Sequence, residues 1–162
     1  MQLPNIFLLA VAAAATLTSA SPVPEQPQLE KRACQTQMPR SLGFPNNYDV
    51  TRTSAGASTT NNIAFNIAPG AVGPCSLVYQ FPVGFPLRTS GSNGGNPPIE
   101  VRAGGSLVGT AALVADGAVH TINSFACAPN LEYQLGIADW ATGEVAFQVT
   151  QAGTGFYMTY SC

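Results

Sequence analysis

Residues 73–82 read GPCSLVYQFP. This is the longest β-favouring run in the chain that has turn residues on both sides. The aliphatic and aromatic side chains at 77–81 favour a strand, and the flanking glycine and prolines stop that strand at either end. Cys75 lies inside the run. The segment is therefore expected to be a buried strand, around which the rest of the fold is organised.

Eight other segments have the apolar alternation or the composition that strands show. They are residues 48–53, 63–67, 99–103, 107–114, 119–125, 131–137, 145–149 and 156–160. The last three alternate most clearly, with polar residues such as Glu132 and Gln148 between the apolar ones. We expect these three to form an antiparallel meander with one apolar face.

That apolar face needs a second sheet to cover it, because no segment of 33–162 has helical periodicity over ten residues. The prediction is a single all-β domain. It is expected to be an antiparallel β-sandwich of eight or nine strands, Ig-like or jelly-roll in outline, and stapled by disulfides.

Two glycine-containing turns are expected between strands. Gly104-Gly105 leads into the strand that follows it, and Asp116-Gly117 has the sequence of a two-residue type I′ hairpin. Three segments are rich in Pro, Gly or small polar residues and are expected to be coil or loop: 33–44, 54–61 and 90–98.

Residues 1–20 have the pattern of a secretory signal peptide, with an apolar run followed by small residues up to Ala20. Residues 21–32 are polar, rich in proline and end at Lys31-Arg32, which resembles a dibasic processing site, so a propeptide is expected there. The mature domain is then 33–162, in the extracellular space. The apolar run is shorter than the roughly 18 to 20 residues of a membrane span, so no span is expected.

Charged residues make up only 9% of the chain, against about 25% in typical soluble domains. Residues 33–162 hold four arginines, six acids and no lysine. Such scattered cations cannot neutralise a run of phosphates, which argues against nucleic acid and anionic membrane surfaces as partners. A host protein or a cell-wall glycan remains as partner, and the chain is expected to be a monomer.

The four cysteines form an even set in a chain with a secretory pattern, which predicts two disulfides. Three pairings are open. We favour Cys75 with Cys127 and Cys34 with Cys162, because the second bridge would tie the two ends of the domain together. By the chain-entropy model each bridge contributes at most about 4 kcal/mol, whichever pairing holds.

Reactive side chains are few. His120 is the only histidine, so any His-dependent mechanism or metal site rests on it alone, and no Gly-x-Ser-x-Gly motif occurs. Glu132 and Glu144 are expected on neighbouring strands, where paired carboxyls can serve glycoside hydrolysis, but solvent-face charges explain them more simply. We expect no enzymatic activity, no cofactor and no metal.

Trp140 and Tyr157 are the candidate binding residues. Trp140 is the only tryptophan and lies in a loop between two expected strands, where an exposed ring can stack on a sugar or fill a partner's pocket. The alternative is that Trp140 folds back over the edge of the sandwich. Tyr157 has outward parity and either extends this aromatic patch or is an ordinary cross-strand partner.

Three motifs carry a family resemblance: residues 73–82, TINSFAC at 121–127 and GFYMTYSC at 155–162. They resemble the fungal secreted domain named after the C-terminal half of "But two", a ubiquitin-pathway-binding protein, in which a Cys-Ser-Leu-Val-Phe-type strand is followed by proline. In that family proline usually follows the middle cysteine at once, whereas Ala128 intervenes here. The resemblance implies a secreted fungal β domain and supplies no catalytic residues.

Together these observations predict a secreted, non-enzymatic protein that acts by binding at the cell wall or in the host apoplast, as an effector in virulence. The first alternative is a carbohydrate-binding or carbohydrate-active domain that uses Trp140 and surface carboxylates. The second is a structural cell-wall protein.

Overall fold

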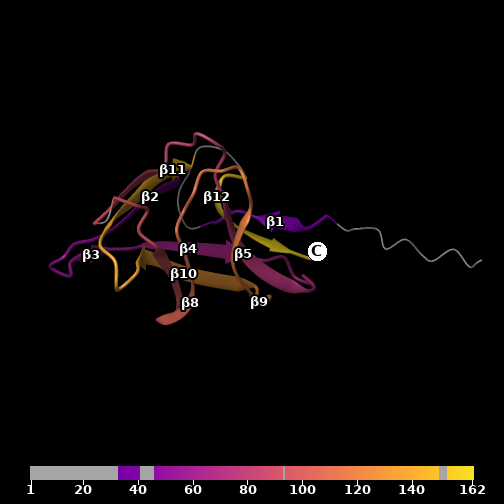
Figure 1. Ribbon diagram of the computed structural model, residues 1–162. Coiled ribbons are helices and arrows are strands. Elements are labelled where there is room, and N and C mark those ends of the chain that lie inside the picture. The colour runs from indigo at the N-terminus through magenta and orange to yellow at the C-terminus, as the bar shows by residue number, and fades with distance from the viewer. Residues whose placement is uncertain (1–32, 41–45, 93, 150–152) are drawn as a thin grey trace, which may run out of the picture. The chain divides into compact units, whose positions relative to one another are not determined.

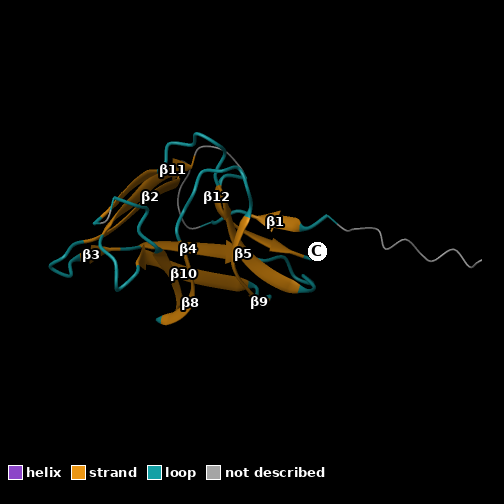
Figure 2. Ribbon diagram, in the orientation of Figure 1, coloured by secondary structure: helices purple, strands orange, loops and turns teal. Residues whose placement is uncertain are grey.

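The computed structural model describes residues 33–40, 46–92, 94–149 and 153–162. The predicted signal peptide with Ala20, and the predicted propeptide with Lys31 and Arg32, lie outside the described residues. The described part of the chain consists of strands and loops (Figure 2), and no helix in it is long and apolar enough to cross a membrane.

In the described residues, twelve strands form three antiparallel sheets of four strands each (Figure 1). Sheet A has the order β1-β12-β5-β9, sheet B the order β3-β2-β11-β6, and sheet C the order β4-β10-β7-β8. The prediction of an all-β, disulfide-stapled antiparallel sandwich is confirmed. The strands are β1 (Gln35–Gln37), β2 (Asn46–Arg52), β3 (Ser58–Thr59), β4 (Asn61–Asn66), β5 (Pro74–Gln80), β6 (Arg88–Gly91), β7 (Ile99–Ala103), β8 (Ser106–Ala111), β9 (His120–Ala126), β10 (Asn130–Ile137), β11 (Gly143–Val149) and β12 (Gly155–Tyr160).

The meander expected from the last three strands is wrong. β10 lies between β4 and β7 in sheet C, β11 lies between β2 and β6 in sheet B, and β12 lies between β1 and β5 in sheet A. Each of the three is therefore a central strand of a different sheet. Their alternation identifies a buried face of each strand, but it does not determine which sheet the strand joins.

The type I′ hairpin expected at Asp116-Gly117 is also wrong, because β8 and β9 belong to sheets C and A. The Asp116 carboxylate instead accepts the N–H of Ala118 at 2.9 Å, which closes the turn locally. The two-residue hairpin is Gly104-Gly105, where Ala103 pairs with Ser106. Both glycines have positive φ, 54° and 84°, as a type I′ turn requires.

Three short strands, β1, β3 and β6, were not expected. Each falls in or overlaps one of the segments expected to be irregular, and each lies at the edge of a sheet. These three strands are only two to four residues long and none of their residues is buried, so the sequence shows no apolar alternation there.

The core lies between the three sheets and receives buried apolar residues from all of them. Aromatic rings join the sheets: Phe156 of β12 lies 5.7 Å from Tyr48 of β2, and Phe125 of β9 lies 5.7 Å from Tyr133 of β10, measured between ring centroids. Gly155 has a φ of 86°, and a Cβ at this position would lie 2.7 Å from Cγ2 of Val149. Glycine is therefore required where β12 begins.

Both disulfides have the favoured pairing. Cys34–Cys162 joins the two ends of the described chain beside the β1–β12 pair, and Cys75–Cys127 joins β5 to the residue after β9. The two bridges therefore both reinforce sheet A.

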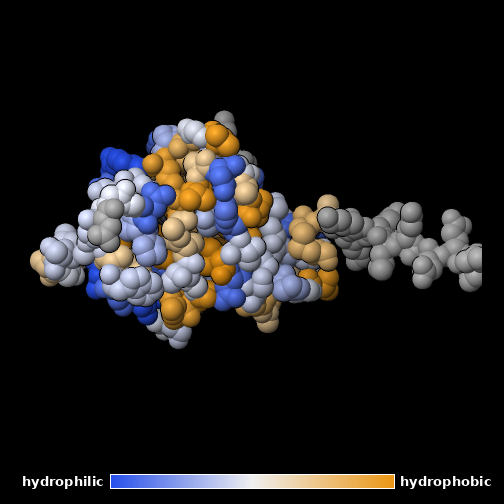
Figure 3. Space-filling model, viewed as in Figure 1, coloured by the Kyte–Doolittle hydropathy of each residue, from blue (hydrophilic) through white to orange (hydrophobic). Residues whose placement is uncertain are grey.

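On the face that Figure 3 shows, apolar residues form separate clusters between polar ones instead of one continuous apolar surface. Large apolar residues that are exposed in the described chain occur mainly at the loops and strand ends: Val72, Val83, Leu107, Val119 and Trp140. Trp140 has the largest side chain of this group.

Candidate functional site

Trp140 lies in the loop between β10 and β11 and is 69% exposed. The alternative in which it folds back over the sandwich edge is therefore wrong. The loop is a tight turn, in which the N–H of Ala141 donates to the carbonyl of Ala138 at 2.9 Å. The N–H of Ala138 donates in turn to the carbonyl of Pro98 at 3.0 Å. A large exposed ring is thus carried on an anchored turn.

Asp139, which precedes Trp140, belongs to a network of four charged side chains. Its carboxylate pairs with Nη1 of Arg52 at 3.0 Å and with Nη2 of Arg102 at 3.2 Å. Arg102 also donates from Nε and Nη2 to Glu100, at 2.8 and 2.5 Å, and Glu100 is only 4% exposed. Because Arg52 is in β2 and Arg102 is in β7, the network ties the Trp140 loop to sheets B and C.

A hollow of about 210 Å³ adjoins Trp140. Residues 91, 92 and 95–98 also line it, and two of them are anchored to the domain although the sequence suggested an irregular loop. The N–H of Ser92 donates to the carbonyl of Thr142 at 3.4 Å, and Nδ2 of Asn96 donates to the carbonyl of Leu113 at 2.8 Å. The hollow beside Trp140 therefore contains an amide side chain, Asn96, that is fixed in place by a hydrogen bond.

Tyr157 does not extend an exposed patch with Trp140. It is 6% exposed on β12 of sheet A, where it pairs opposite Val78, and its hydroxyl donates to Oε1 of Gln80 at 3.2 Å. Burial raises the pKa of Tyr157. The parity of the sequence was misleading here because both faces of β12 are covered, as the burial of Phe156 and Met158 on its other face shows.

Glu132 and Glu144 are not on neighbouring strands, since β10 belongs to sheet C and β11 to sheet B. Glu132 pairs with Arg40 at 3.4 Å, and Glu144 pairs with Arg88 at 2.5 Å. Each carboxylate has its own guanidinium partner, as expected of surface ion pairs.

His120 holds a loop in place. Its Nε2 lies 3.0 and 3.1 Å from the two carboxylate oxygens of Asp116, and its ring stacks on Tyr79 with centroids 4.8 Å apart. The hydrogen bond from His120 lowers the pKa of Asp116. These contacts explain the histidine as a link between the β8–β9 loop and β5. In the part of the chain that the structure describes, no three His, Cys, Asp or Glu side chains gather where they could hold a metal ion.

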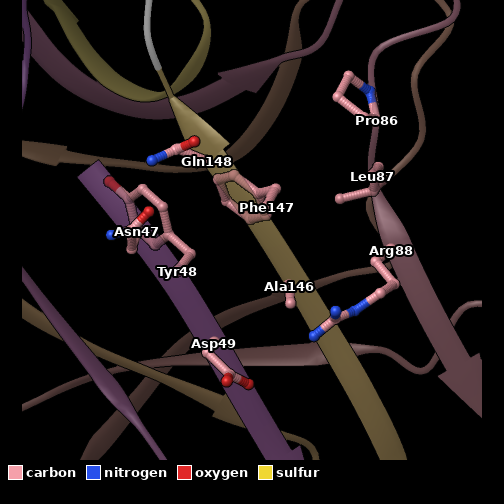
Figure 4. Close-up of a pocket in the computed structure, with 9 residues that line it drawn as sticks. All are labelled: Asn47, Tyr48, Asp49, Pro86, Leu87, Arg88, Ala146, Phe147 and Gln148. Atoms are coloured by element: carbon pink, nitrogen blue, oxygen red, sulfur yellow. The ribbon is translucent and has the colours of Figure 1, made fainter. Parts of the chain in front are cut away.

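A wide, open hollow of about 650 Å³ lies on the outer face of sheet B (Figure 4), and the sequence reasoning missed it. β6 pairs with β11 only from Gly143 to Ala146, and the chain before Arg88 diverges from β11 at Pro86 and Leu87. The hollow lies along β11 where this pairing ends. Polar residues at alternate positions of β2 and β11 could have indicated a solvent-exposed face. The two strands are far apart in the sequence, however, so their pairing cannot be predicted from a local window.

Comparison of the chain with protein-family models, with curated proteins and with solved structures finds no match. The resemblance drawn from the three sequence motifs therefore stays a prediction.

Proposed function

We propose that this chain is a secreted protein without enzymatic activity that acts by binding, at a cell wall or in the apoplast of a host, in the manner of an effector. Two disulfides are compatible with an extracellular protein. The observation that carries the proposal is the exposed Trp140 ring on an anchored turn.

An anchored tryptophan suits a contact residue for a physical reason. Tryptophan buries more apolar surface on binding than other side chains and is enriched among residues that dominate binding energy. Because backbone hydrogen bonds and the Asp139 network already order the turn, little conformational entropy remains to be lost when a partner binds.

Two further observations support binding over catalysis. The ring of His120 is engaged by Asp116 on one side and by Tyr79 on its face. The two carboxylates that could have formed an acid and base pair lie in different sheets, each with an arginine.

A carbohydrate is the second candidate for the partner. Sugar rings present an apolar C–H face and a rim of hydroxyls, which match an aromatic ring flanked by charged and amide side chains. Asp139, the residue before Trp140, pairs with Arg52, and Asn96 lines the same hollow as Trp140.

A pull-down separates the two partners. The secreted protein is incubated with insoluble chitin, β-glucan and cellulose, and bound and free fractions are measured for the native chain, for Trp140→Ala and for Leu107→Ala. Leu107 is the control because it is also an exposed large apolar residue, at the start of β8 in sheet C. Retention that falls about tenfold or more in Trp140→Ala alone identifies a glycan partner.

If no polysaccharide retains the native chain, the partner is expected to be a protein. Cross-linking in apoplastic fluid should then give an adduct that Trp140→Ala loses and Leu107→Ala keeps. Equal behaviour of the two variants in both assays would refute the Trp140 loop as the binding element.

A further inference from the structure

The charged residues of the described chain are paired almost completely. All four arginines contact an acid, and Asp116 contacts His120. Among the acids of the described residues, Asp49 alone has no ion-pair partner. In a domain with so few charges, a carboxylate without an ion-pair partner is a charge that no ion pair within the fold accounts for.

Asp49 lies on the rim of the hollow on the outer face of sheet B. Ala146 is its neighbour in β11, and Arg88 is the neighbour of Ala146 on the other side, in β6. The backbones of Asp49 and Arg88 are thus two strand spacings apart, about 10 Å. Ala146 lies between them and has a much shorter side chain than either, so the surface of the sheet is lowest at Ala146, where the hollow lies (Figure 4).

The next row of the same face carries two amides, because Asn47 pairs with Gln148. Neither amide side chain has a hydrogen bond to another described residue, nor does the carboxylate of Asp49. The rim therefore offers an acceptor at Asp49 and two groups that both donate and accept. It also offers those N–H groups of Arg88 that the pair with Glu144 through Nη2 does not use. Pro86 and Leu87 add an apolar wall along the open edge.

We infer that this groove is a second binding site, specific for a neutral glycan. A hydroxyl group both donates and accepts, so adjacent hydroxyls can satisfy the carboxylate, the guanidinium and the amides together. A polyanion would meet the unpaired carboxylate of Asp49, because the one cation of the rim, Arg88, is already balanced by Glu144. An extended peptide would find little apolar surface for an anchoring side chain at the centre of the groove, where Ala146 offers only a methyl group and is 9% exposed.

The groove does not depend on Trp140. Trp140 lies in the loop before β11, whereas the groove lies along the second half of that strand, from Ala146 to Gln148. The proposal therefore holds even if the Trp140 loop has another partner, and the two sites can be tested separately.

The test is titration calorimetry with neutral pentasaccharides of glucose, mannose and N-acetylglucosamine, followed by NMR of the side-chain amides. We expect at least one of these sugars to bind and to shift the NH₂ signals of Asn47 and Gln148. Asp49→Asn keeps the shape and removes the acceptor-only group, so its affinity should fall about tenfold or more. Ala146→Phe should abolish binding by filling the hollow.

Ser90→Phe is the matched control, because Ser90 is exposed on the same face one row away from Ala146. Both it and Trp140→Ala should bind the sugar as the native chain does. Tighter binding of deacetylated chitin oligomers or of oligogalacturonate than of every neutral sugar would overturn the assignment. So would binding of an extended peptide in their place, or unchanged affinity in both Asp49→Asn and Ala146→Phe.

Discussion

Two arginines allow the effect of burial on an ion pair to be measured inside one protein. Arg102 lies 2.5 Å from Glu100, and Arg88 lies 2.5 Å from Glu144, so the contacts are equally close. Their surroundings differ. The side chain of Glu100 is 4% exposed and that of Arg102 is 33% exposed, whereas Glu144 and Arg88 are 35% and 73% exposed.

We predict that Arg102→Met lowers the free energy of unfolding by about 3 kcal/mol. The substitution leaves the carboxylate of Glu100 buried without its guanidinium, which costs about 3 to 5 kcal/mol for a fully buried pair. The low end applies because Arg102 is partly exposed to solvent. Arg88→Met should cost no more than about 0.5 kcal/mol, since exposed pairs gain little over hydrated side chains.

Urea unfolding followed by tryptophan fluorescence measures both values, and the m-value should stay constant if the native state stays compact. Adding Glu100→Gln to Arg102→Met should recover at least about 1 kcal/mol, because the buried charge is then gone. Equal costs for Arg102→Met and Arg88→Met would refute the reasoning, since desolvation would then play no part. A fluorescence change of folded Arg102→Met is also expected, because the network orders the turn that carries Trp140.

Three further predictions concern stability. Removal of either disulfide by replacing both cysteines with Ala should lower the free energy of unfolding in urea by at most about 4 to 5 kcal/mol. The loss should be larger for Cys34–Cys162 than for Cys75–Cys127, because the first bridge closes a loop of 128 residues and the second a loop of 52. The reverse order would show that the burial of Cys75 outweighs loop entropy. Gly155→Ala should lower the free energy of unfolding by more than about 2 kcal/mol. Gly70 has a similar φ but open space for a Cβ, so Gly70→Ala should lower it by only about 1 kcal/mol. Equal losses would exclude the contact with Val149 as the cause. Burial raises the pKa of Tyr48 and Tyr133, so the stability that their neutral phenols give is present below about pH 10, where free tyrosine ionises, and is lost as the pH rises through the raised pKa values. In an alkaline titration, the absorbance of tyrosinate should therefore rise together with unfolding. Ionisation of all tyrosines near pH 10 in a chain that is still folded would contradict this prediction.

The sequence predicts the strands of this protein well and their partners poorly. Segments such as 131–137 and 145–149 have a clear alternation because their inner residues fill the core. The same alternation made a meander seem the simplest arrangement, but each strand pairs on both edges with strands from distant parts of the chain. Such pairing depends on the register and packing of the whole domain, which no local window contains.

The candidate sites divide in the same way. The loop position of Trp140 was predictable from the strands on either side of it. Its exposure was not, because the sequence equally allowed the ring to fold back over the sandwich edge, and the structure shows it exposed. Of the two alternatives for Tyr157, the structure shows the cross-strand partner and not the exposed patch, because parity gives the face of a strand but not what covers that face. The groove was missed because it depends on where β6 stops pairing with β11, and β6 is a polar edge strand without an apolar pattern.

Both proposed sites are built on β11, and its position gives a physical reason. β11 is a central strand whose inward residues Val145, Phe147 and Val149 are buried in the core, so its backbone is fixed from one face and from both edges. Its outward residues are then held in place by the strand itself, and the loop before it is held in addition by its hydrogen bonds and the Asp139 network. Side chains presented by such a strand lose little entropy on binding, which favours recognition of ligands that offer only hydroxyls and ring faces. A core substitution such as Val145→Ala should therefore weaken both sites together, whereas an equivalent change in the core of sheet C, Val101→Ala, should lower stability while leaving the groove intact.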